Sequence, residues 1–99
     1  MEKERFRKVV VTTDKDRRGV FFGTLLEHDI KASTCVLVDA RMCLYWSSAT
    51  RGVLGLAAIG PQKGSRVTPS VPRLELNGVT SVIDATDGAV ARWEIGIWD

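Results

Sequence analysis

Two stretches decide the fold class of this chain: Arg18-Gly-Val-Phe-Phe-Gly-Thr-Leu25 and Val36-Leu-Val-Asp-Ala-Arg-Met-Cys-Leu-Tyr-Trp46. Both are rich in β-branched and aromatic residues, which favour strands. They predict two long strands, over Val20 to Ile30 and over Thr34 to Trp46. Gly23, inside the first strand, predicts a bulge or a sharp bend, as a small barrel requires at a corner. We therefore expect a small, strongly bent sheet.

Alternation along the second of these strands assigns its two faces, because successive side chains of a strand point to opposite sides. The face assigned to the core holds Val36, Val38, Ala40, Met42, Leu44 and Trp46. The opposite, mixed face holds Cys35, Leu37, Asp39, Arg41, Cys43 and Tyr45.

Shorter β-rich runs flank the two long strands. Val9-Val-Val-Thr-Thr13 is β-branched throughout and predicts a buried strand. Towards the other end, Arg73-Leu-Glu-Leu76 and Val79-Thr-Ser-Val-Ile-Asp84 are separated by Asn77-Gly78. Asn-Gly between β-rich runs is typical of a type I′ turn, so we expect these two segments to form a hairpin.

Helical structure is expected in two places. The apolar segment Gly52 to Pro61 holds three glycines, which favours no more than one or two helical turns packed across the sheet. Residues 62–72 are expected to form a loop that is long for a compact domain. A final helix is expected over about Gly88 to Ile97, because Thr86 or Asp87 is suited to cap its N-terminus.

These elements predict a mainly β (α+β) fold: a small bent antiparallel sheet or SH3-like barrel of about five strands, with a C-terminal helix. Ninety-nine residues suit a single domain over 1–99. No apolar run approaches the ~20 residues of a membrane span, and the charged N-terminal segment lacks the apolar centre of a signal peptide. We therefore expect a cytoplasmic protein with no membrane partner.

The net charge of +2 conceals an uneven distribution. Residues 40–74 carry five basic residues and no acidic one, whereas residues 75–99 carry five acidic residues and one basic residue. Either the two segments pair, within one fold or between subunits, or the basic segment faces an acidic partner. Open sheet edges are a second reason to expect a homodimer.

Basic residues around the glycine-rich segment are the candidate binding site for a phosphate or an acidic protein surface. They are Arg51, Lys63, Arg66 and Arg73. The alternative is that they are ordinary solvated side chains of a loop. Trp98, one residue from the end of the sequence, is the expected aromatic anchor of an interface. The three glycines themselves have the backbone freedom to cradle an anion, but tight packing across the sheet is favoured.

The sequence holds no group of residues that predicts catalysis. His28 is the only histidine, and its neighbours Glu27 and Asp29 point to the other face of a strand, so a surface role is favoured over that of a general base. Cys35 and Cys43 lack the cationic or helix N-terminal setting that activates a thiol. Along one extended strand they are also too far apart for a disulfide. We therefore expect no enzyme activity, no metal and no cofactor.

Residues 9–40 resemble the first half of an Sm-like fold. Three elements carry the resemblance: Gly23-Thr-Leu25, Asp29 and Val36-Leu-Val-Asp-Ala40. The resemblance implies a small barrel. It does not extend to RNA binding, because Ala32-Ser33 stands at the place of that family's base-stacking Asn, and Ile83-Asp-Ala85 stands near the place of its Arg-Gly loop.

Nearly the whole chain resembles a group of short phage and prophage proteins of uncharacterised function. The matching segments are Arg18-Gly-Val-Phe-Phe-Gly23, Ala40-Arg41, Tyr45-Trp46, Gly52-Val-Leu-Gly-Leu-Ala-Ala-Ile-Gly-Pro61 and Val79-Thr-Ser-Val82. The resemblance implies a non-catalytic phage protein that binds a host protein complex and inhibits a defence system by surface occupation, as anti-CRISPR proteins do. Two alternatives stay open: an oligomeric small β-barrel that binds nucleic acid or a nucleotide, and a virion structural or assembly protein.

Overall fold

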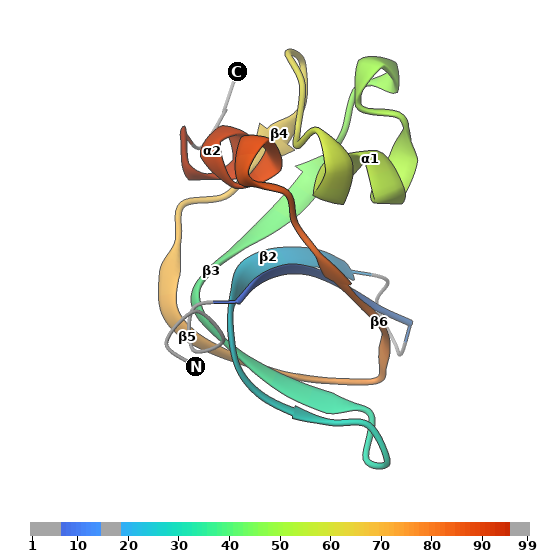
Figure 1. The fold of residues 1–99 in the computed structure, drawn as a ribbon, viewed down its shortest axis with the longest axis vertical. Helices are drawn as coiled ribbons and strands as arrows, with labels where there is room; N and C mark the ends of the chain where they lie inside the picture. Colours follow the sequence, from blue (N-terminus) through green and yellow to red (C-terminus); the bar gives the residue numbers. More distant parts are fainter. Residues whose placement is uncertain (1–6, 15–18, 96–99) are drawn as a thin grey trace.

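The computed structural model describes residues 7–14 and 19–95 (Figure 1). Their elements, in chain order, are β1 (Lys8–Thr13), β2 (Gly19–Asp29), β3 (Thr34–Tyr45), the 3-10 turn η2 (Ser48–Thr50), α1 (Gly52–Ala58), β4 (Arg66–Val67), β5 (Val71–Asn77), β6 (Val79–Asp84) and α2 (Asp87–Ile95). The predicted mainly β fold with a C-terminal helix is confirmed.

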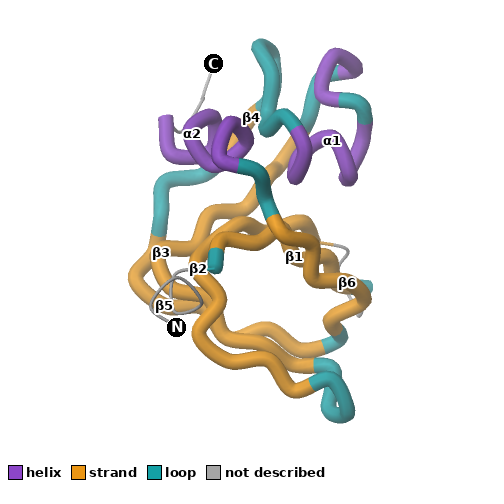
Figure 2. Tube along the Cα trace, viewed as in Figure 1, coloured by secondary structure: helices purple, strands orange, loops and turns teal. Residues whose placement is uncertain are grey.

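The strands form one antiparallel sheet that curls on itself (Figure 2). The strand order is β4-β3-β2-β1-β6. The outer edge of β3 is shared by two strands: β5 pairs with its first half and β4 pairs with its end. The sheet bends far enough to bring β5 and β6 to the same corner, but hydrogen bonds do not close it into a ring. The sequence predicts either a small bent antiparallel sheet or an SH3-like barrel. Of these two forms, the structure has the bent antiparallel sheet.

The predicted hairpin of residues 73–84 is wrong. β5 pairs with β3 and β6 pairs with β1, so the two strands do not pair with each other. Gly78 has a φ of 68°, and the N–H of Val79 donates to the carbonyl of Ser33 over 2.9 Å. Asn77-Gly78 is thus a corner between two parts of the sheet. Long neighbouring strands offer each segment more hydrogen bonds and buried area than a short hairpin would, so tertiary pairing overrides the local turn preference.

A bulge at Asp39 bends β3 against β2. Thr24 faces Val38 and Phe22 faces Arg41, so Gly23 faces two residues at once. Asp39 adopts a left-handed conformation with a φ of 53°. A Cβ on Gly23 would lie 3.1 Å from the carbonyl oxygen of Val38. The bend predicted from this glycine is confirmed, and only a glycine leaves room for it.

The bulge also overturns the face assignment of β3. Cys35, Leu37 and Cys43, assigned to the mixed face, are buried with exposures of 2%, 0% and 4%. Leu44, assigned to the core, is 50% exposed, and Val38 is only partly buried. An extra residue in one strand of a pair breaks the two-residue period, so strict alternation fails on a bulged strand.

Two hydrophobic clusters lie on opposite faces of β1, whose Val9, Val10 and Val11 are all fully buried. Val9 and Val11 face the inside of the curled sheet, with Cys35, Leu37 and Ala40. Val10 faces the helices, with Phe22, Cys43, Leu56, Ala57, Val67, Ala89 and Trp93. The β-branched run thus forms a central strand that is buried on both sides.

The two helices pack together over the outer cluster (Figure 1). In α2, the hydroxyl oxygen of Thr86 accepts a hydrogen bond from the N–H of Ala89 over 3.1 Å, which is the geometry of an N-cap. Thr86, rather than Asp87, therefore caps the helix. The expected loop of residues 62–72 contains β4, which pairs with the end of β3. Together α1, α2, η2, β4 and the loop between α1 and β4 form what we call the helical end of the molecule.

Candidate functional site

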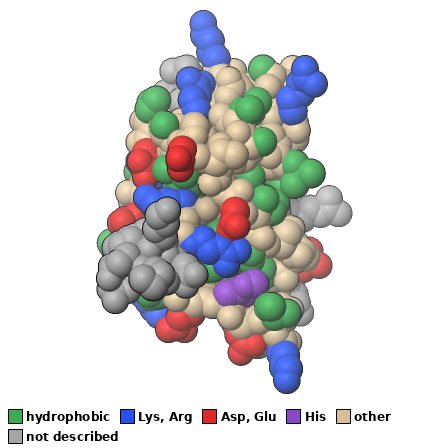
Figure 3. Space-filling view, viewed as in Figure 1, with side chains coloured by type: hydrophobic (Ala, Val, Ile, Leu, Met, Phe, Trp, Pro, Cys, Tyr) green, Lys and Arg blue, Asp and Glu red, His purple; other side chains and the backbone are tan. Residues whose placement is uncertain are grey.

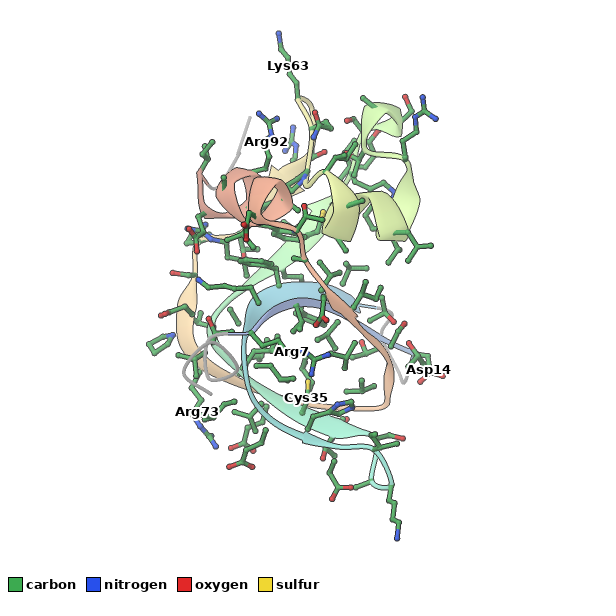
Figure 4. All side chains as sticks on the ribbon, in the orientation of Figure 1. Arg7, Asp14, Cys35, Lys63, Arg73 and Arg92 are labelled. Carbon is green, nitrogen blue, oxygen red and sulfur yellow. The ribbon has the colours of Figure 1, made fainter. Side chains whose placement is uncertain are left out.

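Three of the predicted cations lie on the helical end. Arg51 sits between η2 and α1 with a φ of 69°, Lys63 lies in the turn after α1, and Arg66 begins β4. All three side chains are exposed. Lysine and arginine side chains project from this end in Figure 3, and Lys63 is its outermost labelled side chain in Figure 4. The structure therefore groups residues that the sequence only placed near one another in the chain.

Arg92 joins this end from α2, and sequence reasoning missed it. Its Nε donates to the carbonyl of Pro61 over 3.1 Å. Gly60 makes the approach possible, because a Cβ there would lie 2.7 Å from the Cβ of Arg92. Nothing in the sequence pattern marks the contact, since it joins residues about thirty positions apart through tertiary packing. Arg92 thus adds one cation to this end (Figure 4), whereas α2 also carries the acidic residues Asp87 and Glu94.

Arg73 does not belong to this group. It lies on β5, forms an ion pair with Glu75, and stands away from Lys63 and Arg92 in Figure 4. The predicted set of four cations is therefore split between two parts of the molecule. The predicted anchor Trp98 lies outside the described residues.

The acidic residues near the end of the chain pair with cations of the sheet. Asp84 accepts from Arg7 over 2.5 Å, and Glu94 accepts from Lys8 over 2.7 Å. Within the part of the chain that the structure describes, neither Arg51 nor Lys63 forms an ion pair. Among the described residues, the acidic segment therefore pairs with Arg7, Lys8 and Arg73, and it leaves Arg51 and Lys63 without a carboxylate partner.

Exposed apolar side chains accompany these cations. Tyr45 is 57% exposed and faces Arg66 across the β3–β4 pair, while Leu54 of α1 is 69% exposed. Ile59, after α1, is 44% exposed. Single exposed apolar residues are normal on protein surfaces, but aliphatic and tyrosine side chains beside basic ones have the mixed character of protein interfaces.

A buried hydroxyl network holds this surface in one shape. The hydroxyls of Thr50 and Ser65 lie 3.2 Å apart, and both residues are fully buried. Ser65 also accepts from the N–H of Ser47, and Thr50 accepts from the N–H of Gln62, over 3.0 and 3.1 Å. These bonds join the turn that carries Arg51 to the turn that carries Lys63. The two cations therefore stand on one rigid support.

Of the three glycines of this segment, Gly55 and Gly60 serve close packing, as favoured from the sequence, whereas a Cβ on Gly52 would meet nothing within 4 Å. A Cβ on Gly55 would lie 1.6 Å from the carbonyl oxygen of Thr50, so α1 packs directly against the backbone of η2. That close approach occupies the space in which an anion cradle would have to form.

The cysteine thiols are free and buried, in different clusters. Burial raises the pKa of Cys35, and it raises the pKa of Cys43 to about 11 against a weaker, opposing backbone hydrogen bond of Tyr45. Both thiols are thus poor nucleophiles near neutral pH. Among the described residues, no group of three or more His, Cys, Asp and Glu side chains is placed to hold a metal ion. No helix in those ranges has the length and apolar character needed to cross a membrane.

Comparison with known families assigns the chain. The model of the family described as "Domain of unknown function (DUF6948)" matches residues 6–93. The chain therefore belongs to this family. Comparisons with the curated proteins and with the solved structures gave no match.

Proposed function

We propose that this chain is a non-catalytic binding protein, and that its helical end docks on an acidic surface of a host protein complex. The observation that carries the proposal is the placing of Arg51 and Lys63. Both are exposed, neither has a carboxylate partner among the described residues, and a buried hydroxyl network holds them on one support. Turns that are already held in one arrangement favour association, because little ordering of the loops is left to occur on binding.

The exposed apolar side chains of the same end support a protein as the partner. Tyr45, Leu54 and Ile59 would bury apolar area in an interface, with the cations setting orientation and the rate of encounter. The resemblance to short phage and prophage proteins supports a target within a host defence system. Surface occupation of an anti-CRISPR type needs no catalytic residue.

Charge reversal tests the proposal. Arg51→Glu combined with Lys63→Glu should abolish capture of the host complex by the tagged protein, because a like charge then meets the acidic partner surface. Each substitution is on the surface, so stability should change by no more than about 0.5 kcal/mol per site. Lys31→Glu is the matched control for Lys63→Glu. Lys31 is equally exposed, but it lies in the turn between β2 and β3, at the other end of the molecule (Figure 1).

Salt dependence separates the proposal from nucleic-acid binding. Binding to random oligonucleotides would weaken steeply with salt, with a log–log slope of about −0.9 for each duplex phosphate neutralised. We expect little oligonucleotide binding by the purified protein. Strong, salt-sensitive binding that the double charge reversal removes would replace the protein partner with a nucleic acid. Capture of the same host complex by the folded double variant would exclude the helical end as the binding surface.

A further inference from the structure

A groove of about 430 Å³ lies on the face of the molecule away from the candidate site. It is lined by Arg7, His28, Ile30 and Ser33 on one side and by Val79, Thr80, Ser81 and Val82 on the other. Figure 4 shows Arg7 within the ring of strands, well apart from Lys63 and Arg92. The groove therefore belongs to the curled sheet and has no part in the helical end.

The β6 side of this groove is the free edge of the strand. Four consecutive residues of β6 line it, whereas side chains of consecutive residues point alternately to opposite faces. A surface that touches all four must therefore run along the backbone edge. β1 already occupies the other edge of β6, so the groove runs along the edge for which the described residues provide no partner strand.

The register identifies which backbone groups face the groove. The N–H of Ala85 donates to the carbonyl of Lys8 over 3.0 Å. Hydrogen-bonded and non-hydrogen-bonded pairs alternate along an antiparallel ladder, so Ile83 and Ser81 also bond toward β1. The N–H and C=O groups of Val82 and Asp84 consequently point to the free edge. At the start of the strand, the N–H of Val79 already donates outward, to Ser33.

Over Ser81 to Ile83, β6 lacks the features that usually keep a free edge unpaired, because its charged residue Asp84 and its bulge at Thr80 lie at the two ends of the strand. Natural edge strands are protected by proline, lysine or other charged side chains. β5, the other strand at this corner, has such protection, since it contains Pro72 and the ion pair of Arg73 with Glu75. β6 reads Val-Thr-Ser-Val-Ile-Asp, with neither proline nor lysine. The contrast within one sheet marks β6 as the edge open to pairing.

The shape and charge of the groove select its occupant. His28, Ile30 and Ser33 line the same groove of about 430 Å³ as β6, so a segment bound along β6 would also contact these residues. Arg7 and His28 are the ionisable side chains of the lining, and both are bases. Asp84 holds the Nε of Arg7 at 2.5 Å and so fixes the guanidinium at the groove. The complementary ligand is an extended peptide with an acidic side chain.

We propose that β6 accepts an extended acidic peptide segment of a partner protein by strand addition, in antiparallel or parallel pairing along Val79 to Asp84. Backbone hydrogen bonds to Val82 and Asp84 supply affinity, as in other cases of strand addition, and Arg7 selects the acidic side chain. This surface is separate from the helical end, so the proposal stands independently of the one above.

Peptide selection tests the proposal on the full-length protein. A random library of peptides of roughly twelve residues is selected against it, and the enriched peptide is labelled and measured by fluorescence polarisation. We expect an acidic, β-branched consensus, because such residues favour an extended partner strand. Hydrogen exchange should show that the peptide newly protects the amides of Val82 and Asp84, whereas those of Ser81 and Ile83 are protected without it. Alternate amides of the bound peptide face β6, and the others face away from it. N-methylation of the amides that face β6 should abolish binding, whereas N-methylation of the other set should leave binding unchanged.

Two variants separate the charge of Arg7 from a general loss of charge. Arg7→Gln should weaken binding of the selected peptide by about tenfold, as expected for one charge-assisted hydrogen bond. Lys8→Gln is the matched control, because Lys8 pairs with Glu94 and does not line the groove. It should change the affinity by less than about twofold. Failure to enrich any peptide, or an enriched peptide that leaves the Val82 and Asp84 amides unprotected, would overturn the proposal. Protection of those amides without peptide, in a protein that light scattering shows to be a dimer, would instead assign the edge to a second copy.

Discussion

Trp93 of α2 stacks on Phe22 of β2, with ring centroids 4.9 Å apart and an angle of 7° between the ring planes. The indole N–H of Trp93 donates to the carbonyl of Leu56 in α1 over 3.0 Å. One fully buried side chain thus joins the sheet, the first helix and the second helix. This contact fixes α2 against α1 and the sheet, and Arg92, one residue before Trp93, is positioned with it.

Replacing Trp93 should therefore loosen the helical end more than the sheet. Trp93→Ala should destabilise the protein by about 3–5 kcal/mol, the usual cost of deleting a large buried aromatic side chain. Trp93→Phe keeps the stacking but leaves the carbonyl of Leu56 without its donor, which should cost about 1–3 kcal/mol. Urea denaturation followed by far-UV circular dichroism measures both. Equal stability of Trp93→Phe and the wild type would show that the hydrogen bond to Leu56 contributes nothing.

Two glycines of the helices, Gly55 in α1 and Gly88 in α2, should respond in opposite ways to alanine. Gly55→Ala should be destabilising by about 1–3 kcal/mol or more, because its Cβ would overlap the Thr50 carbonyl and force α1 away from η2. Gly88→Ala is the control, since a Cβ there meets only the Thr86 hydroxyl, at 4.0 Å. That variant should gain about 0.5–1 kcal/mol from helix propensity. Thermal unfolding of the two variants measures both changes in stability. If Gly55→Ala were more stable than the wild type, the close packing of α1 on η2 would be contradicted.

The bulge at Asp39 predicts an order of stabilities for two neighbouring residues of β3. Leu37→Ala should cost about 2–5 kcal/mol, because Leu37 is fully buried inside the curled sheet. Val38→Ala should cost much less, since Val38 is only partly buried and belongs to neither hydrophobic cluster. Chemical denaturation of both variants gives the comparison. A larger loss of stability in Val38→Ala than in Leu37→Ala would instead support strict alternation of buried and exposed residues along β3.

Ionisation of Cys43 should lower stability in alkaline solution. Burial raises the pKa of this thiol in the folded protein to about 11, from its usual value of 9.0. Stability is therefore unaffected below the unfolded pKa and falls between the two values, because the unfolded chain releases the proton first. We expect a loss of about 1–2 kcal/mol across this window. Cys43→Ala should lose less over the same pH range in thermal unfolding, and parallel loss in both proteins would assign the effect to other groups.

Much of the architecture was predictable from sequence because it rests on local composition. The β-branched run of residues 9–13, the two long strands and the helix beginning beside Thr86 all follow from propensity and capping. The bend at Gly23 was predictable for the same reason, since a glycine inside a strand weakens regular pairing and permits close approach. Such preferences act within a few residues, so they can be recognised without knowledge of the fold.

The candidate surfaces were only partly predictable, because they join distant parts of the chain. Sequence identified Arg51, Lys63 and Arg66 by the lack of acidic neighbours, but grouped them with Arg73, which the sheet carries elsewhere. It missed Arg92, whose approach depends on the packing of α2 against the loop after α1. It also dismissed His28 as an isolated surface residue, although it shares a groove with Arg7.

By itself, the sequence determined that this is a small, mainly β domain with a bent sheet, a terminal helix and an uneven charge. Only the tertiary structure decided how the strands pair and which residues face each other. Asn77-Gly78 became a corner because β3 and β1 are better partners than the two short segments are for one another, and one bulge at Asp39 exchanged the faces of β3. Pairing and register depend on the summed burial and hydrogen bonding of the whole sheet, which no local pattern contains.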